Sequence, residues 1–187
     1  MTTIDARPPG SRASAHRFGV LWAVALPLLA AVAAHSTGRV WPAVFAVAIV
    51  AGVAARHDVR RGIIPDPAVV SAAAVPALMA LAGYCQGART WVDVVVGTAV
   101  MSVPMLVLHA VDPRLIGFGD VKLAAALGAG LGLVDPRLGL IALAVAAVGS
   151  LYHAVGTGAH RVPFAPALLA GFTVSVLMAS GESGAAR

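Results

Sequence analysis

Charged residues in this 187-residue chain form short clusters that leave seven long stretches without any charge. The uncharged stretches are 18–38, 40–55, 67–88, 94–111, 123–134, 138–160 and 162–181. A helix needs about 20 mostly apolar residues, with a range of about 17–25, to cross the hydrocarbon core of a bilayer. Five stretches meet that length unaided. The other two, 40–55 and 123–134, must extend into the neighbouring clusters, toward Asp58 and back toward Asp120.

Helices are the expected spanning elements, because lipid cannot satisfy open backbone groups and the stretches lack the period-two alternation of a barrel strand. Apolar residues make up 59% of the chain and charged residues only 11%, which excludes an ordinary soluble domain. We therefore predict an all-α fold: a polytopic transmembrane helix bundle of about seven spans, with a six-span core from residue 40 onward. Small residues such as those of the Gly128–Gly132 segment would line its interfaces, where they let backbones approach closely.

Positive charge predicts the orientation of this bundle. Nine Arg and Lys residues fall on the side of the N-terminus and four on the other, so the N-terminus is expected inside. Residues 1–17 would then be a cytoplasmic tail, 18–181 a single membrane-embedded domain and 182–187 a C-terminal tail. The stretch 18–34 has an alternative interpretation as a cleaved signal peptide, although its apolar run is longer than usual.

The charges, the cysteine content and the histidine positions exclude other classes of protein and of site. The charges are spread too thinly for a nucleic-acid surface. The single cysteine, Cys85, excludes a disulfide within the chain and any paired-cysteine zinc site. His109 and His153 lie in apolar stretches without a second ligand at helical spacing, so no metal is predicted.

Two segments place an aspartate at the end of a span. Residues 57–66 read His-Asp-Val-Arg-Arg-Gly-Ile-Ile-Pro-Asp, and residues 117–123 read Gly-Phe-Gly-Asp-Val-Lys-Leu. Because two spans lie between them, Asp58 and Asp120 are expected at the same, cytoplasmic, membrane face. Two carboxyl groups that share a site cannot both ionise cheaply, so one keeps its proton while the other deprotonates a water that attacks a peptide carbonyl. Such chemistry requires no metal or other cofactor.

Helix dipoles favour the proton on Asp58, at the end of one span, and the charge on Asp120, at the start of another. Arg60 and Arg61 could reverse that order by stabilising charge on Asp58. Each aspartate also has a structural interpretation. Asp120 would serve as a helix N-cap, and Asp58 would be a solvated partner of nearby arginines.

Glycines and a lysine surround Asp120. Gly117 and Gly119 permit unusual backbone conformations and the close approach of another backbone, such as a substrate strand. Lys122 either supports the site electrostatically or extends its amine to the membrane interface. Arg60 and Arg61 are expected to set topology and to attract anionic lipid or an acidic part of a substrate.

Together the two segments resemble the signature motifs of type IV prepilin peptidases, membrane aspartic proteases that remove the leader from prepilins. Residues 162–171, which read Val-Pro-Phe-Ala-Pro-Ala-Leu-Leu-Ala-Gly, are similar to a segment near the C-terminus of that family, so the resemblance covers about residues 40–171. It implies that Asp58 and Asp120 are the catalytic residues. Pro65 belongs to the first motif, and Asp66 matches a variable position that we interpret as a helix-start or turn residue rather than a catalyst.

The resemblance also implies a partner and a location: a prepilin or pilin-like membrane substrate, cleaved at the cytoplasmic face of the bacterial cytoplasmic membrane. Larger members of the family carry a cytoplasmic segment with paired cysteines, associated with methylating the new N-terminus. This chain has no cysteine pair and only 22 residues between Arg17 and Val40, so a short, peptidase-only form is predicted.

Two alternative functions stay open from the sequence. Proteases of the presenilin or signal-peptide-peptidase type also use Gly-x-Gly-Asp and have a Pro-Ala-Leu near the C-terminus, as residues 166–168 read here. They place the first aspartate after a tyrosine deep within a span, whereas Asp58 follows a histidine and precedes two arginines. A proton- or cation-coupled transporter component could also hold two intramembrane aspartates. That class is expected to show paired broken helices or an internal repeat, and the sequence has neither.

Overall fold

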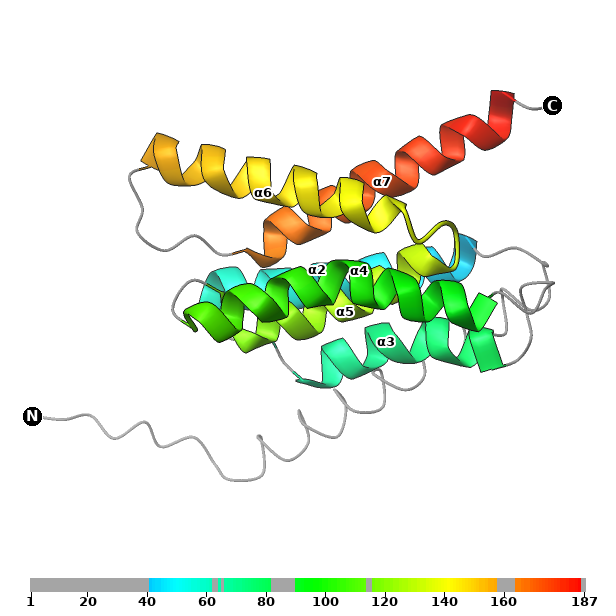
Figure 1. Cartoon of the computed structure of the whole chain (residues 1–187), viewed down its shortest axis with the longest axis horizontal. Helices are drawn as coiled ribbons and strands as arrows, with labels where there is room; N and C mark the ends of the chain where they lie inside the picture. Colours follow the sequence, from blue (N-terminus) through cyan, green and yellow to red (C-terminus); the bar gives the residue numbers. More distant parts are fainter. Residues whose placement is uncertain are drawn as a thin grey trace, which may run out of the picture.

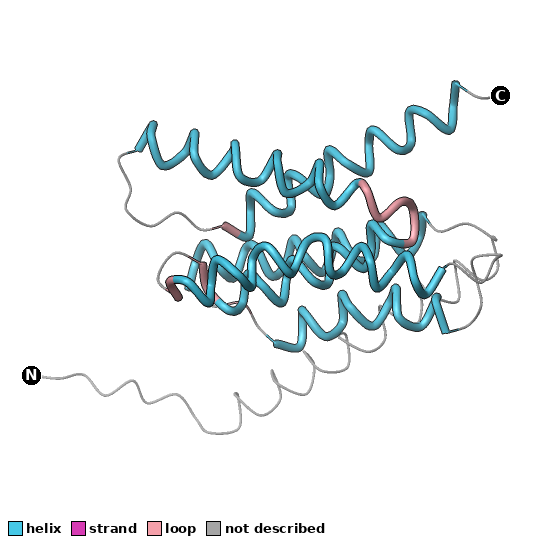
Figure 2. Tube along the Cα trace, viewed as in Figure 1, coloured by secondary structure: helices cyan, strands magenta, loops and turns pink. Residues whose placement is uncertain are grey.

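The computed structural model describes residues 41–61, 64, 66–81, 90–113, 116–157 and 164–185. Within these ranges the chain forms six α-helices and no strand (Figures 1 and 2). The helices are α2 (Trp41–Arg61), α3 (Asp66–Leu81), α4 (Thr90–Val111), α5 (Phe118–Gly132), α6 (Leu138–Thr157) and α7 (Ala165–Ala185). They correspond to the six stretches expected from residue 40 onward. The tail 1–17 and the stretch 18–38 lie outside the described residues.

The two stretches that were too short to span a membrane extend as predicted. Helix α2 continues past Asp58 to Arg61, and α5 begins at Phe118, two residues before Asp120. Helix α7 continues to Ala185, so residues 182–185, expected in the C-terminal tail, prolong that helix. No proline follows Pro166 to interrupt it, and each added residue contributes a further helical hydrogen bond.

The apolar surface of the described helices is consistent with a membrane protein. By length and composition, Trp91–Val111 of α4 and Leu138–Gly156 of α6 can cross a bilayer. In the most apolar 18-residue segment of each helix, only 22% (α4) and 17% (α6) of the segment is buried inside the protein. A core helix of a soluble protein would be mostly buried. Three other apolar helices, Trp41–His57, Asp66–Leu81 and Ala165–Ala179, are shorter. The number of spans, about seven, therefore stays a prediction.

Consecutive helices run in opposite directions along the bundle (Figure 1). The ends of α2, α4 and α6 and the starts of α3, α5 and α7 consequently lie at one end, on the left in the figure. We call this the motif end, because the segments that contain Asp58 and Asp120 both lie there. The two intervening helices, α3 and α4, thus bring these segments to the same end of the bundle, as predicted, whereas the membrane face of that end stays a prediction.

Helix α5 is the centre of the bundle. It contacts each of the other five described helices, and every residue from Ala126 to Gly132 is buried. Helices α6 and α7 pack together along one side of the molecule, and α3 lies on the opposite side (Figure 1). The start of this central helix carries Asp120, so the packing of α5 determines where that carboxylate lies.

Small residues make the central packing possible, as the sequence predicted. Gly97 of α4 lies directly against Gly128 and Gly132 of α5, and a Cβ atom at Gly97 would lie only 2.9 Å from the Cα atom of Gly132. On another side of α5, a Cβ atom at Gly130 would lie 3.1 Å from Cγ1 of Val47 and 3.4 Å from Cε2 of Phe172. The Gly128–Gly132 segment thus lines interfaces with α4, α2 and α7.

Candidate active site

Asp120 is held in the first turn of α5 by a backbone hydrogen bond. The N–H of Gly117, the N-cap residue, donates to Oδ2 of Asp120 over 3.3 Å. In turn the Asp120 N–H donates to the carbonyl of Gly117 over 3.0 Å. Asp120 is therefore the third residue of the helix, and the alternative interpretation of Asp120 as the N-cap is wrong. A carboxylate in this turn is stabilised by the positive end of the helix dipole, and Oδ1 of Asp120 is buried.

Gly119 brings the two aspartate motifs into contact. A Cβ atom at Gly119 would lie 3.3 Å from Cβ of Ile64, the described residue between α2 and α3. That distance is tighter than ordinary carbon–carbon contact, so a larger residue at position 119 would require Ile64 to shift by a few tenths of an ångström. The sequence predicted a close approach at this glycine by another backbone, and in the structure the neighbour is the side chain of Ile64.

Lys122 forms a second link between the motifs. Its Nζ atom lies 2.7 Å from Oδ1 of Asp66, the first residue of α3, and 5.1 Å from the centre of the Phe118 ring. The side chains of Lys122 and Asp66 are 38% and 72% exposed, so solvent screens this ion pair. Asp66 begins a helix, which is one of the two positions predicted for it, but sequence analysis missed its pairing with Lys122. The available signal was the opposite charge of two residues expected on the same membrane side.

His109 joins the end of α4 to the start of α5. Its Nδ1–H donates to the carbonyl of Ile116 over 2.8 Å, a direction set by the carbonyl being an acceptor only. The His109 ring also packs against Phe118, with 5.6 Å between ring centres. Phe118 therefore contacts both His109 and Lys122. Within the described ranges, no group of three or more His, Cys, Asp or Glu residues is arranged to hold a metal ion.

The remaining predicted site residues are placed only through the backbone. Asp58, Arg60 and Arg61 lie in the last turn of α2, at the motif end and in a helix that contacts α5. Their side chains and all of Pro65 lie outside the described residues. The pairing of Asp58 with Asp120 therefore stays a prediction, whereas the contact between the two motifs that contain them is observed.

The apolar exposed helices and the aspartate at the start of the central helix define a multi-span membrane protein with a carboxylate site at one end. The chain belongs to the type IV leader peptidase family, whose profile matches residues 45–180, from α2 into α7. Members of this family are aspartic-type prepilin peptidases, so the resemblance of the motifs is confirmed and the chain is a protease of that type. Comparisons with curated proteins and with solved structures gave no significant match.

Proposed function

We propose that this chain is an integral membrane aspartic endopeptidase that cleaves the basic leader from type IV prepilins or pilin-like proteins. Cleavage would take place at the cytoplasmic face of a bacterial cytoplasmic membrane, with Asp58 and Asp120 as the catalytic residues. The observation that carries the proposal is the contact between the two aspartate motifs, made by Gly119 with Ile64 and by Lys122 with Asp66.

In the proposed reaction the two carboxyl groups have different protonation states. The ionised Asp120, in the first turn of α5, takes a proton from a water molecule, and the water oxygen bonds to the carbonyl carbon of the scissile peptide. The carboxyl group of Asp58 gives its proton to the carbonyl oxygen. The tetrahedral intermediate then collapses: the carbon–nitrogen bond breaks, the leaving amine takes the proton held by Asp120, and Asp58 recovers its own. One water is consumed for each leader released.

The test is co-expression with a candidate prepilin, with loss of the leader followed by gel shift and intact mass. Asp58→Asn and Asp120→Asn keep the size of the side chain and remove the ionisable group. Each substitution is expected to lower cleavage by about 10²–10⁴-fold, the usual contribution of general acid–base groups. Asp135→Asn is the matched control, because Asp135 is an exposed turn residue that accepts a hydrogen bond from the Arg137 N–H over 2.8 Å.

The variants must be compared at equal abundance in the membrane. Cleavage by Asp135→Asn together with failure of both Asp58→Asn and Asp120→Asn would support the catalytic pair. Retained cleavage in either of the latter two would show that the corresponding aspartate has been assigned wrongly. A wild-type protein that cleaves none of several pilin-like substrates, in membranes or in detergent, would overturn the proposed substrate class.

A further inference from the structure

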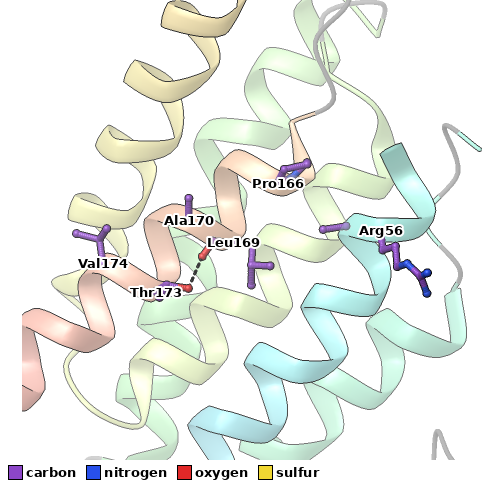
Figure 3. A pocket seen from close by; sticks show the side chains of 7 residues that line it. Arg56, Pro166, Leu169, Ala170, Thr173 and Val174 are labelled. Carbon is purple, nitrogen blue, oxygen red and sulfur yellow. Dashed lines mark hydrogen bonds between the residues drawn. The ribbon is translucent and has the colours of Figure 1, made fainter. Parts of the chain in front are cut away.

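An apolar groove runs along one side of α7 beside the last turns of α2 (Figure 3). Its volume is about 710 Å³, and its lining residues are Ala55, Arg56, Pro166, Leu169, Ala170, Thr173 and Val174. The hydroxyl of Thr173 donates to the carbonyl of Leu169 over 2.9 Å, so it presents no unpaired donor to the groove. Arg56 extends away from α7 in Figure 3 and leaves the groove itself apolar.

The lining residues of α7 form a helical stripe. Pro166, Leu169, Ala170, Thr173 and Val174 follow the spacing i, i+3, i+4, i+7, i+8, which is the pattern by which one helix packs against another. Such a stripe with small residues is typical of helix–helix contacts in membranes. Leu169 is half-buried beside Gly52 of α2, whereas Ala170, Thr173 and Val174 are exposed and no described helix covers them. The geometry of the stripe therefore matches a further apolar helix.

The dimensions of the groove match a short length of helix. From Pro166 to Val174 the stripe rises about 12 Å, or a little over two helical turns. A helix that packs against this stripe would therefore contact it over about two turns.

The groove ends beside the proposed catalytic site. Ala55, which lines it, lies three residues before Asp58 in α2, a distance of about 4.5 Å along the helix axis. Pro166, at the other side of this end, is the second residue of α7 and so also lies at the motif end. A helix that occupies the groove would thus have its cytoplasmic end within about one turn of Asp58.

We propose that this groove, the α2–α7 groove, binds the apolar transmembrane helix of the substrate and thereby places the peptide bond that precedes it at Asp58 and Asp120. The inference rests on the proposed function, in which the substrate is a basic leader followed by a membrane helix. Apart from Arg56, the lining residues of the groove are uncharged, so the groove recognises the shape and apolarity of that helix, and the leader lies beyond its motif end.

Cysteine cross-linking tests the occupancy of the groove directly. The background is Cys85→Ser, which removes the only native cysteine, with Asp120→Asn to keep the substrate uncleaved. Ala170→Cys places the probe in the groove. Ala147→Cys, at an exposed alanine of the neighbouring helix α6, is the matched control. Each is oxidised in membranes with a candidate prepilin that carries single cysteines at successive positions of its apolar helix.

Ala170→Cys is expected to cross-link to substrate positions that recur every three to four residues, and Ala147→Cys is not. Cleavage by the wild type without a cross-link from Ala170→Cys overturns the proposed role of the groove and leaves the proposed function standing. The proposed role of the groove is also overturned if Ala170→Cys and Ala147→Cys cross-link equally to the substrate. The same holds if Ala170→Cys forms a disulfide-linked dimer of this protein without the substrate. Absence of cleavage by the wild type counts against the proposed function, and a periodic cross-link at Ala170 would support the groove even then. Absence of both cleavage and cross-linking overturns the proposed function and the role of the groove together.

A kinetic readout separates recognition from catalysis. Ala170→Leu fills part of the groove and is expected to raise KM for the helix-bearing substrate by about tenfold or more with little change in kcat. Ala147→Leu is the control and is expected to leave both unchanged. A lower kcat at unchanged KM in Ala170→Leu would overturn the proposal. Unchanged kinetics in this variant would overturn it too, because they are expected for a groove that is filled by lipid.

Discussion

Replacing Gly128 with alanine is expected to force α4 away from the central helix. A Cβ atom at Gly128 would overlap with the carbonyl oxygen of Gly97 and lie 3.0 Å from Cβ of Met101. Carbon atoms in contact lie about 3.5–4.0 Å apart, so the two helices would have to separate by at least about 0.5–1 Å. The obstructing oxygen and carbon of Gly97 belong to the backbone and cannot rotate aside as a flexible side chain would.

The size of the effect follows from this overlap. Overpacking of a close interface costs about 1–3 kcal/mol. The better helix propensity of alanine offsets up to about 1 kcal/mol of that cost. Because the obstructing atoms are backbone atoms, the upper part of that range, about 2–3 kcal/mol, applies, and the expected net loss is about 1–2 kcal/mol of unfolding free energy. Asp120 lies eight residues before Gly128 in α5, or about 12 Å along the axis. If Asp120 is catalytic, as proposed, a displacement of about 1 Å there is expected to lower the rate by about 100-fold.

The structure offers a matched control for this substitution. Gly149 lies in α6, and a Cβ atom there would have nothing within 4 Å. Gly149→Ala is expected to leave stability unchanged or slightly raised, while Gly128→Ala lowers both the unfolding midpoint in detergent and the rate of leader cleavage. Equal unfolding midpoints for the two variants would refute the argument that backbone contact between α4 and α5 requires glycine.

Two further predictions concern single side-chain contacts. Lys122→Gln and Asp66→Asn are each expected to lower cleavage several-fold while changing the unfolding free energy by less than about 1 kcal/mol, because their ion pair is exposed. The double variant should be little worse than either single one, and additive losses in this double-mutant cycle would contradict the pairing. Ser175, which is fully buried, donates its hydroxyl hydrogen to the Leu138 carbonyl over 3.1 Å. Ser175→Ala should lose about 0.5–1.5 kcal/mol in equilibrium unfolding, and wild-type stability would show that the bond contributes nothing.

The positions of the helices could be predicted because membrane crossing is a local property. Charges are costly in lipid, so the charge clusters mark where each helix can end. The same reasoning required α2 to extend past Asp58 and α5 to begin before Asp120, as observed. Alternation of the helices then placed both aspartate motifs at one end. The close contacts of Gly128 and Gly132 were likewise predictable, because lipid-embedded helices approach most closely at small residues.

The tertiary structure alone decided which helix is central and which side chains meet. These helices are apolar almost all the way round, so the sequence contains little information on which face of each is buried. The rotation of a helix depends on the fit of its neighbours. For that reason the pairing of Lys122 with Asp66, the hydrogen bond from His109 to Ile116 and the partly exposed stripe on α7 could not be predicted. The sequence by itself determined the helices and the end of the bundle at which the aspartates lie, because length and charge act locally. Packing between distant segments decided the contacts of the site and its adjoining groove.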